Sequence, residues 1–91
     1  MSTWQASEHP MAVRIDIAVG VPPSWSKRRQ AAALTGGEVP GKPDLDNVAK
    51  AVLDACNGIA YVDDRQVTRL TVTKAYASQA GIEVYMHEVI E

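Results

Sequence analysis

Two pairs of aspartates and one lysine are the residues whose types and spacing are best suited to chemistry. Asp44 and Asp46 are separated by one residue, and Asp63 and Asp64 are adjacent. Mg²⁺ prefers oxygen ligands and typically takes one or two carboxylates together with waters and phosphate oxygens. Lys50 follows Asp46 by four residues, so on a helix its ammonium would lie near the first pair and could stabilise charge on a phosphate. The pattern is suited to holding a divalent cation beside a phosphate group.

Each of these signals also has a plain structural explanation. Asp44 is suited to cap a helix, and the second acidic pair is suited to a turn. Lys50 is suited to an ion pair with a helical neighbour, Asp46 or Asp54. Taken singly, the structural explanations are the more common ones. They do not explain why both acidic pairs lie at the ends of elements that would pack side by side.

The elements that position these residues follow from hydrophobic periodicity. Residues 13–21 alternate between apolar and polar, which predicts a strand with one buried face that ends at Pro22-Pro23. Ser24 is expected to cap a short helix over residues 25–34, and a glycine pair at residues 36–37 ends it.

The clearest periodicity lies over residues 45–56, where apolar residues recur at helical spacing. Asp44 is suited to begin this helix, and Asn57-Gly58 supplies a left-handed end. Residues 59–62 are predicted to form a short apolar strand, followed by a turn over residues 63–65.

Two further strands are expected near the C-terminus. Residues 66–76 are rich in Val and Thr, and we expect them to form an antiparallel hairpin with residues 82–90. The order of elements predicts an α+β domain with a small mixed, mostly antiparallel sheet and helices packed on it. Residues 1–10 are expected to be a flexible lead-in to a single domain over residues 11–91.

The composition fits one small domain in the cytoplasm. Ninety-one residues bury only roughly 60–65% of their unfolded surface, so a partner would add stability. No apolar run approaches a membrane span, and the lone Cys56 excludes an internal disulfide. The net charge of −2 argues against a nucleic-acid partner, but only weakly. Five of the eleven acids lie within residues 44–64, where a bound divalent cation would change the local sign of the charge.

The acidic pairs and the lysine belong to a longer joint pattern, which covers roughly residues 12–86. Its segments are Pro23-Ser24-Trp25-Ser26-Lys27-Arg28-Arg29, Lys42-Pro43-Asp44-Leu45-Asp46-Asn47, Lys50, Leu53-Asp54-Ala55, Asn57-Gly58, Tyr61-Val62-Asp63-Asp64-Arg65-Gln66-Val67 and Lys74. This pattern resembles the RusA family of crossover-junction endodeoxyribonucleases, and its upstream segment is similar to a phage-borne subgroup.

The resemblance implies a role for each motif residue. By it, Asp44, Asp46 and Asp64 are catalytic ligands of Mg²⁺, for which Mn²⁺ can substitute, and Lys50 is a catalytic phosphate contact. If Asp64 lies away from Asp44, Asp63 is the alternative ligand. The resemblance also implies a homodimer that resolves Holliday junctions in DNA recombination and repair. Strand 13–21, strand 82–90 or the helix over 25–34 is expected to form its interface.

Family members usually carry another strand and helix ahead of the region that begins here at Met11. We therefore expect a truncated reading frame, a fragment or a reduced relative of the family. Two alternatives stay open: a catalytically impaired dimer that binds junctions, and a plain divalent-metal-binding interaction domain.

Basic residues are expected to contact the DNA backbone. Lys27-Arg28-Arg29 is as well explained by a solvated helix face as by a phosphate-binding patch. Lys74 and Arg69 of the predicted hairpin are candidates to face the DNA, but a lysine on an outer strand also guards against edge pairing. For Trp25, packing within the protein is favoured over stacking on a base. The candidate DNA contacts are Lys27, Arg28, Arg29, Lys42, Arg65, Arg69 and Lys74.

Overall fold

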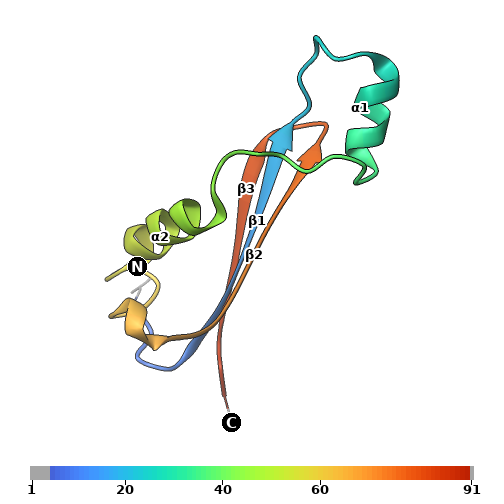
Figure 1. Ribbon diagram of the computed structural model, residues 1–91. Helices are drawn as coiled ribbons and strands as arrows, with labels where there is room; N and C mark the ends of the chain where they lie inside the picture. Colours follow the sequence, from blue (N-terminus) through green and yellow to red (C-terminus); the bar gives the residue numbers. More distant parts are fainter. Residues whose placement is uncertain (1–4, 91) are drawn as a thin grey trace, which may run out of the picture.

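The computed structural model describes residues 5–90 as a three-stranded sheet with two helices (Figure 1). The α+β class is therefore confirmed. The elements in chain order are β1 (Met11–Gly20), α1 (Lys27–Leu34), α2 (Leu45–Cys56), the 3-10 helix η1 (Asp64–Gln66), β2 (Val67–Ala77) and β3 (Gly81–Glu88).

The strand order is β2-β1-β3, so β1 is the central strand. It pairs with β2 in parallel and with β3 in antiparallel orientation. The predicted hairpin between the last two strands is wrong, because β1 lies between them. The sheet is mixed as expected, with one antiparallel pairing of two. The physical reason for the central place of β1 is that this strand carries most of the buried apolar side chains. A central place covers both of its edges.

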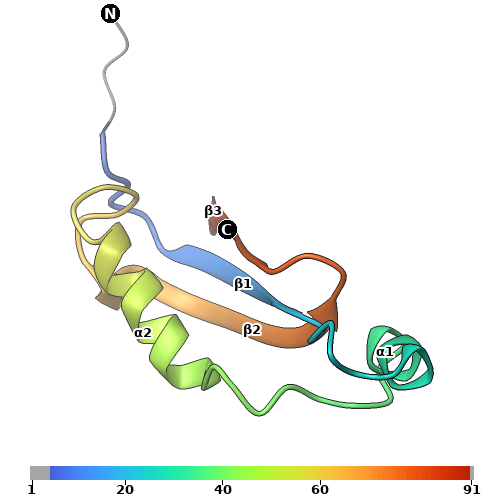
Figure 2. The same cartoon turned by 90° about the horizontal axis from the view of Figure 1, so that it is seen from above.

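Helix α2 lies on one face of the sheet (Figure 2). Val13, Ile15 and Ile17 of β1 pack against Ala49 of α2 to form the core. Val48, Val52 and Leu53 of the same helix pack around this cluster, as do Val67, Val72 and Met86 from the outer strands. The apolar helix face predicted for residues 45–56 is confirmed with its bounds, and this contact fixes the direction of α2 along the sheet.

The other face of the sheet is polar. Arg14 forms an ion pair with Asp16 at 3.0 Å, and the Thr73 hydroxyl donates to Asp16 at 2.7 Å. These contacts, the Thr73 hydrogen bond first, lower the pKa of Asp16. On β3, the Tyr85 hydroxyl donates to the carboxylate of Glu83, two residues earlier on the same strand. The alternation predicted for residues 13–21 is thus confirmed, with the apolar side toward α2.

Helix α1 begins at Lys27, two residues later than the sequence predicted. Its N-cap is Ser26, whose side chain accepts the Arg29 amide, in place of Ser24. The shift arises because the amide of Trp25 donates to the carbonyl of Pro22 at 3.2 Å, which makes a turn ahead of the helix.

The predicted strand over residues 59–62 is wrong. Residues 58–60 form a turn, and Tyr61 makes only single bridges to Ser7 and Asn57. Tyr61 is fully buried, and its hydroxyl donates to the carbonyl of Leu53 at 2.7 Å. Ile59 and Val62 are exposed, so the apolar run supplies one anchor rather than a strand face.

The described part of the predicted lead-in contacts this same region. The Ser7 amide donates to the carbonyl of Ala60 at 3.0 Å. The Gln66 side-chain amide donates to the carbonyls of Ser7 and His9 at 2.7 and 2.9 Å. Gln66 therefore joins residues 7–9 to the turn that carries the second acidic pair. The rest of the predicted lead-in, residues 1–4, lies outside the described residues.

Candidate metal and nucleic-acid site

Asp44 occupies the N-cap position of α2 but does not cap the helix. Its backbone is extended, with φ −71° and ψ 133°, and its side chain accepts no capping hydrogen bond. One carboxylate oxygen accepts a 3.4 Å hydrogen bond from the side chain of Asn47. Asp46 follows in the first helical turn, and both aspartates are exposed. Two carboxylates therefore stand at the positive end of the helix dipole with oxygen atoms available for a ligand.

Asp63 has a structural role instead. Its carboxylate accepts the Arg65 amide at 2.9 Å, and the Gln66 side chain accepts the Asp63 amide at 2.8 Å, which completes a capping box on η1. The Arg65 amide is the main reason that the pKa of Asp63 lies below its ordinary value. These contacts occupy Asp63, which weakens its candidacy as the alternative metal ligand.

Asp64 lies in an environment that disfavours its negative charge. The hydrogen bond with Asp63 is the largest cause, followed by burial and by the charges of Asp63 and Asp54, and together they raise the pKa of Asp64. A cation bound there would relieve this repulsion. Asp54 comes from the last turn of α2, so η1 lies beside the C-terminal end of that helix (Figure 1).

The structure therefore separates the predicted ligands. Asp46 and Asp54 are eight residues apart on one helix, which corresponds to about 12 Å along its axis. Within residues 5–90, no group of three or more His, Cys, Asp or Glu side chains lies close enough to hold a metal ion. Asp44 and Asp46 stand at the N-terminal end of α2, whereas Asp64 lies near Asp54 in its last turn. The short connection over residues 57–63 explains this position of η1.

Lys50 lies between the two acidic groups. It is exposed and follows Asp46 by one helical turn, and Asp54 follows it by another. The ion pairs of the described residues do not include Lys50, so its predicted structural pairing is not formed. The charge of Asp54 acts on Asp64, a proximity that the sequence interpretation did not predict. The sequence signal was the helical spacing of Asp54 from Asp46, which was assigned to a pairing with Lys50.

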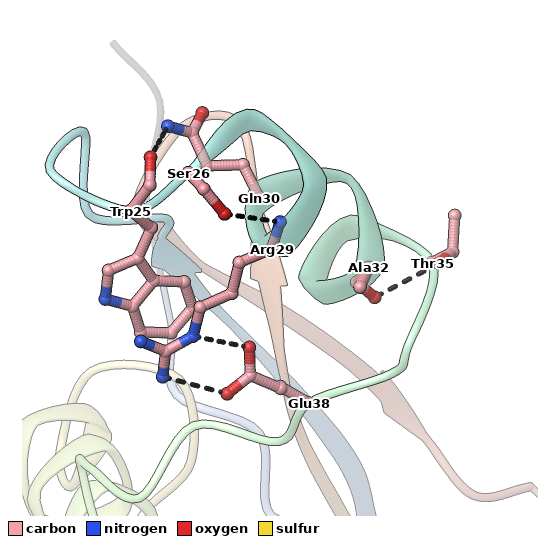
Figure 3. Close-up of polar contacts among 7 residues, drawn as sticks. All are labelled: Trp25, Ser26, Arg29, Gln30, Ala32, Thr35 and Glu38. Atoms are coloured by element: carbon pink, nitrogen blue, oxygen red, sulfur yellow. Dashed lines mark hydrogen bonds and ion pairs between the residues drawn. The ribbon is translucent and has the colours of Figure 1, made fainter.

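The basic run at the start of α1 divides into two parts. Lys27 and Arg28 are exposed, whereas the Arg29 guanidinium forms two hydrogen bonds to Glu38 at 2.9 and 3.0 Å (Figure 3). This pair raises the pKa of Arg29 and lowers that of Glu38. Arg29 also lies 3.4 Å from the ring centroid of Trp25. Its charge is already paired, so Lys27 and Arg28 are the free cations of this run.

Trp25 packs within the protein, as the favoured interpretation predicted. Its ring meets that of Tyr76 edge to face, with centroids 5.3 Å apart and an interplanar angle of 66°. With Arg29 over its face, the indole has protein neighbours on two sides, an arrangement that suits a packing role rather than base stacking.

The remaining basic candidates differ in how free their charges are. Lys42 and Arg69 are exposed, and Arg65 is exposed but forms an ion pair with Asp63 at 3.3 Å. Lys74 is half-buried, and its ammonium donates to the carbonyls of Gly41 and Pro43. Lys74 therefore points toward the loop before α2 from an outer strand of the sheet, and its predicted contact with DNA stays a prediction.

No helix among the described residues is long and apolar enough to cross a membrane.

Comparisons with known proteins place the chain in a family. A family model described as endodeoxyribonuclease RusA matches residues 1–87. The chain is 43% identical over 67 residues to the uncharacterized protein YqaN of Bacillus subtilis strain 168. This match covers 72% of the chain and 47% of YqaN, so the chain spans about half the length of the curated relative it matches. No solved structure matches the chain. The chain belongs to the RusA family of endodeoxyribonucleases.

Proposed function

We propose that this chain is a Mg²⁺-dependent endonuclease that resolves four-way junction DNA by phosphodiester hydrolysis, in recombination and repair. Family membership supports the class of reaction. The observation that carries the proposal is the state of Asp44, which stands at the N-cap of α2 without capping it. A carboxylate at that position ordinarily bonds to the helix amides. Here its oxygens make no capping bond and accept only a long 3.4 Å bond from the Asn47 side chain, so they are available for a ligand next to Asp46.

The donor set at the start of α2 fits a hard divalent cation. Asp44 and Asp46 are exposed oxygen donors, and two carboxylates with waters and phosphate oxygens meet the usual needs of Mg²⁺. Asp64 is the proposed third ligand. A cation bound at Asp64 would relieve the repulsion among Asp54, Asp63 and Asp64. A bound Mg²⁺ would supply a more acidic water and an electrostatic clamp on a phosphate oxygen.

The chain's own cations complete the proposed site. The Lys50 ammonium, one turn from Asp46, stabilises the charge that develops on the phosphate. Lys27, Arg28, Lys42 and Arg69 contact the DNA backbone and set its position without reading its sequence.

Cleavage of an end-labelled four-way junction tests this function. We expect products in Mg²⁺, none in EDTA, and little cleavage of a linear duplex of the same sequence. Binding in Ca²⁺ without cleavage in Mg²⁺ would favour the impaired junction-binding dimer. If the chain does not bind the junction in either ion, the result would favour a metal-binding interaction domain.

Lys50→Ala is expected to lower the single-turnover rate of junction cleavage about a hundredfold, since it removes a charge that acts mainly in the transition state. Junction affinity in Ca²⁺ should change only about twofold. Lys42→Ala is the comparison, with weaker binding and a nearly unchanged rate at saturating protein. Equal losses of rate and affinity in Lys50→Ala would make Lys50 an ordinary phosphate contact.

We also propose that the chain forms a homodimer through β3. Strand β1, one of the predicted interfaces, is flanked by strands on both sides, whereas β3 is an edge strand. Ile82 and Val84 lie on the apolar face of β3 and are 53% and 40% exposed, and Tyr85 is 51% exposed. An apolar, unpaired edge of this kind is suited to isologous pairing with a second copy. Junction resolution also needs two active sites related by a two-fold axis.

Sedimentation velocity at micromolar concentration tests the dimer. The wild-type chain should sediment with twice its mass of 9.8 kDa. Ile82→Lys should give a folded monomer, because the side chain is half exposed in one copy and would be buried between two. Val39→Lys is the matched control, since Val39 is 75% exposed and lines a hollow with Ala75 and Tyr76 of β2, the edge strand opposite β3. A wild-type monomer would contradict the proposal.

A further inference from the structure

Lys74 interrupts an apolar stripe on the inner face of β2. In the register of the sheet, Lys74 pairs with Ile17, which is buried in the core beneath α2. Val72, two residues earlier on the same face, packs against that core. A lysine at such a position places its charge on the side of the sheet that faces the helices, where an apolar side chain would be usual. An ammonium group at this position therefore needs specific hydrogen-bond acceptors.

That partner is the loop between α1 and α2. The Lys74 ammonium lies 3.0 Å from the carbonyl oxygen of Pro43 and 3.4 Å from that of Gly41. The loop is outside any strand or helix, so its carbonyls are not part of a backbone ladder. An ammonium with three donors can satisfy both carbonyls at once. Lys74 thus bridges β2 to the chain just before α2.

We propose that Lys74 is a positioning residue for the Asp44–Asp46 pair. Pro43 immediately precedes Asp44, so a bond to its carbonyl fixes the backbone at the point where the extended chain becomes helix. Fixing that point sets the direction of the Asp44 side chain, which the helix does not hold through a capping bond. The inference rests on the proposed function of Asp44 and Asp46 as metal ligands.

The contacts do not suit a direct role of Lys74 on DNA. Its side chain is half-buried and its ammonium is directed at two backbone oxygens. Lys42, within the same loop, is exposed and better placed for a phosphate contact. The two lysines thus divide the tasks at the start of α2 between positioning and binding.

Calorimetric titration with Mn²⁺ in the absence of DNA tests the inference. Lys74→Met keeps the aliphatic stem without the donors and should weaken Mn²⁺ binding roughly tenfold, at the low end of what outer partners of metal ligands contribute. Lys74→Arg should restore affinity to within about threefold. Thr71→Met is the matched control on the opposite face of β2 and should bind Mn²⁺ like the wild type. Asp44→Asn should abolish binding.

Amide hydrogen exchange is the second measurement. The Val48 amide donates to the Asp44 carbonyl in the first turn of α2. It should exchange faster in Lys74→Met, while the amides of β1 keep their protection. Unchanged Mn²⁺ affinity and unchanged Val48 exchange in Lys74→Met would overturn the positioning role, whatever Asp44→Asn does. Unchanged Mn²⁺ affinity in Asp44→Asn would instead contradict the metal site, and Val48 exchange would then decide the role of Lys74 alone.

Discussion

Asp64→Asn is expected to lower the single-turnover rate of junction cleavage in Mg²⁺ about a thousandfold, which is the scale of losing a metal ligand. The carboxamide has nearly the same shape but no negative charge. It also removes the repulsion that raises the pKa of Asp64, so the fold should be at least as stable as in the wild type. Quenched-flow cleavage of a labelled junction measures the rate, and urea denaturation measures the stability.

Two neighbouring variants make this result specific. Asp63→Asn should chiefly lower stability, because Asp63 caps η1 through the Arg65 amide. Asp54→Asn should leave cleavage within a few-fold of the wild type if Asp64 joins Asp44 and Asp46 around the metal. A loss in Asp54→Asn as large as that in Asp64→Asn would place the metal at the C-terminal end of α2. A rate unchanged in Asp64→Asn would remove this residue from the site.

Tyr61→Ala is expected to lower the free energy of unfolding by about 3–5 kcal/mol, the usual cost of deleting a large buried aromatic side chain. Tyr61 is fully buried and anchors residues 57–63 against α2. Tyr61→Phe removes only the hydrogen bond to the Leu53 carbonyl and should cost about 1 kcal/mol. Urea denaturation followed by circular dichroism measures both. Val62→Ala, at a side chain 55% exposed, is the control and should cost less than about 0.5 kcal/mol.

The Tyr61 phenol should also make the free energy of unfolding depend on pH in the alkaline range. Burial raises the pKa of Tyr61 to about 12, from 10.0. The folded state thus favours the neutral phenol more than the unfolded state does. Its contribution is fully present below pH 10 and is lost as the pH rises through about 12. Tyr61→Phe should lack this pH dependence. Equal alkaline sensitivity of the two proteins, or a small loss in Tyr61→Ala, would contradict the anchoring role.

The sequence predicted the elements whose pattern is local. Strand β1 and helix α2 follow from alternation and from helical spacing. Asp46 and Lys50 lie on α2 as that spacing requires, with Asp44 at its N-cap. Strand pairing is not local. Two adjacent strands with a short connection usually form a hairpin, and only the burial of β1 on both edges favours the observed order.

Of the site, the sequence predicted only the part that α2 positions, namely Asp44, Asp46 and Lys50. Which end of α2 lies beside η1 depends on how residues 57–63 turn, and that turn depends on the burial of Tyr61. The contacts of Lys74 also join residues more than thirty positions apart, through backbone carbonyls that carry no sequence signal. The separation of Asp64 from Asp44 and the role of Lys74 were therefore beyond sequence reasoning.

The central position of β1 has a consequence for how the chain folds. Both of its partners lie more than fifty residues further along the chain, since Met11 pairs with Val67 and with Glu88. Such distant pairings give a high contact order, and chains of this kind fold slowly for their size. During synthesis β1, the most apolar of the three strands, leaves the ribosome before both of its pairing partners. It is the segment on which a chaperone would act, and the place where aggregation would begin.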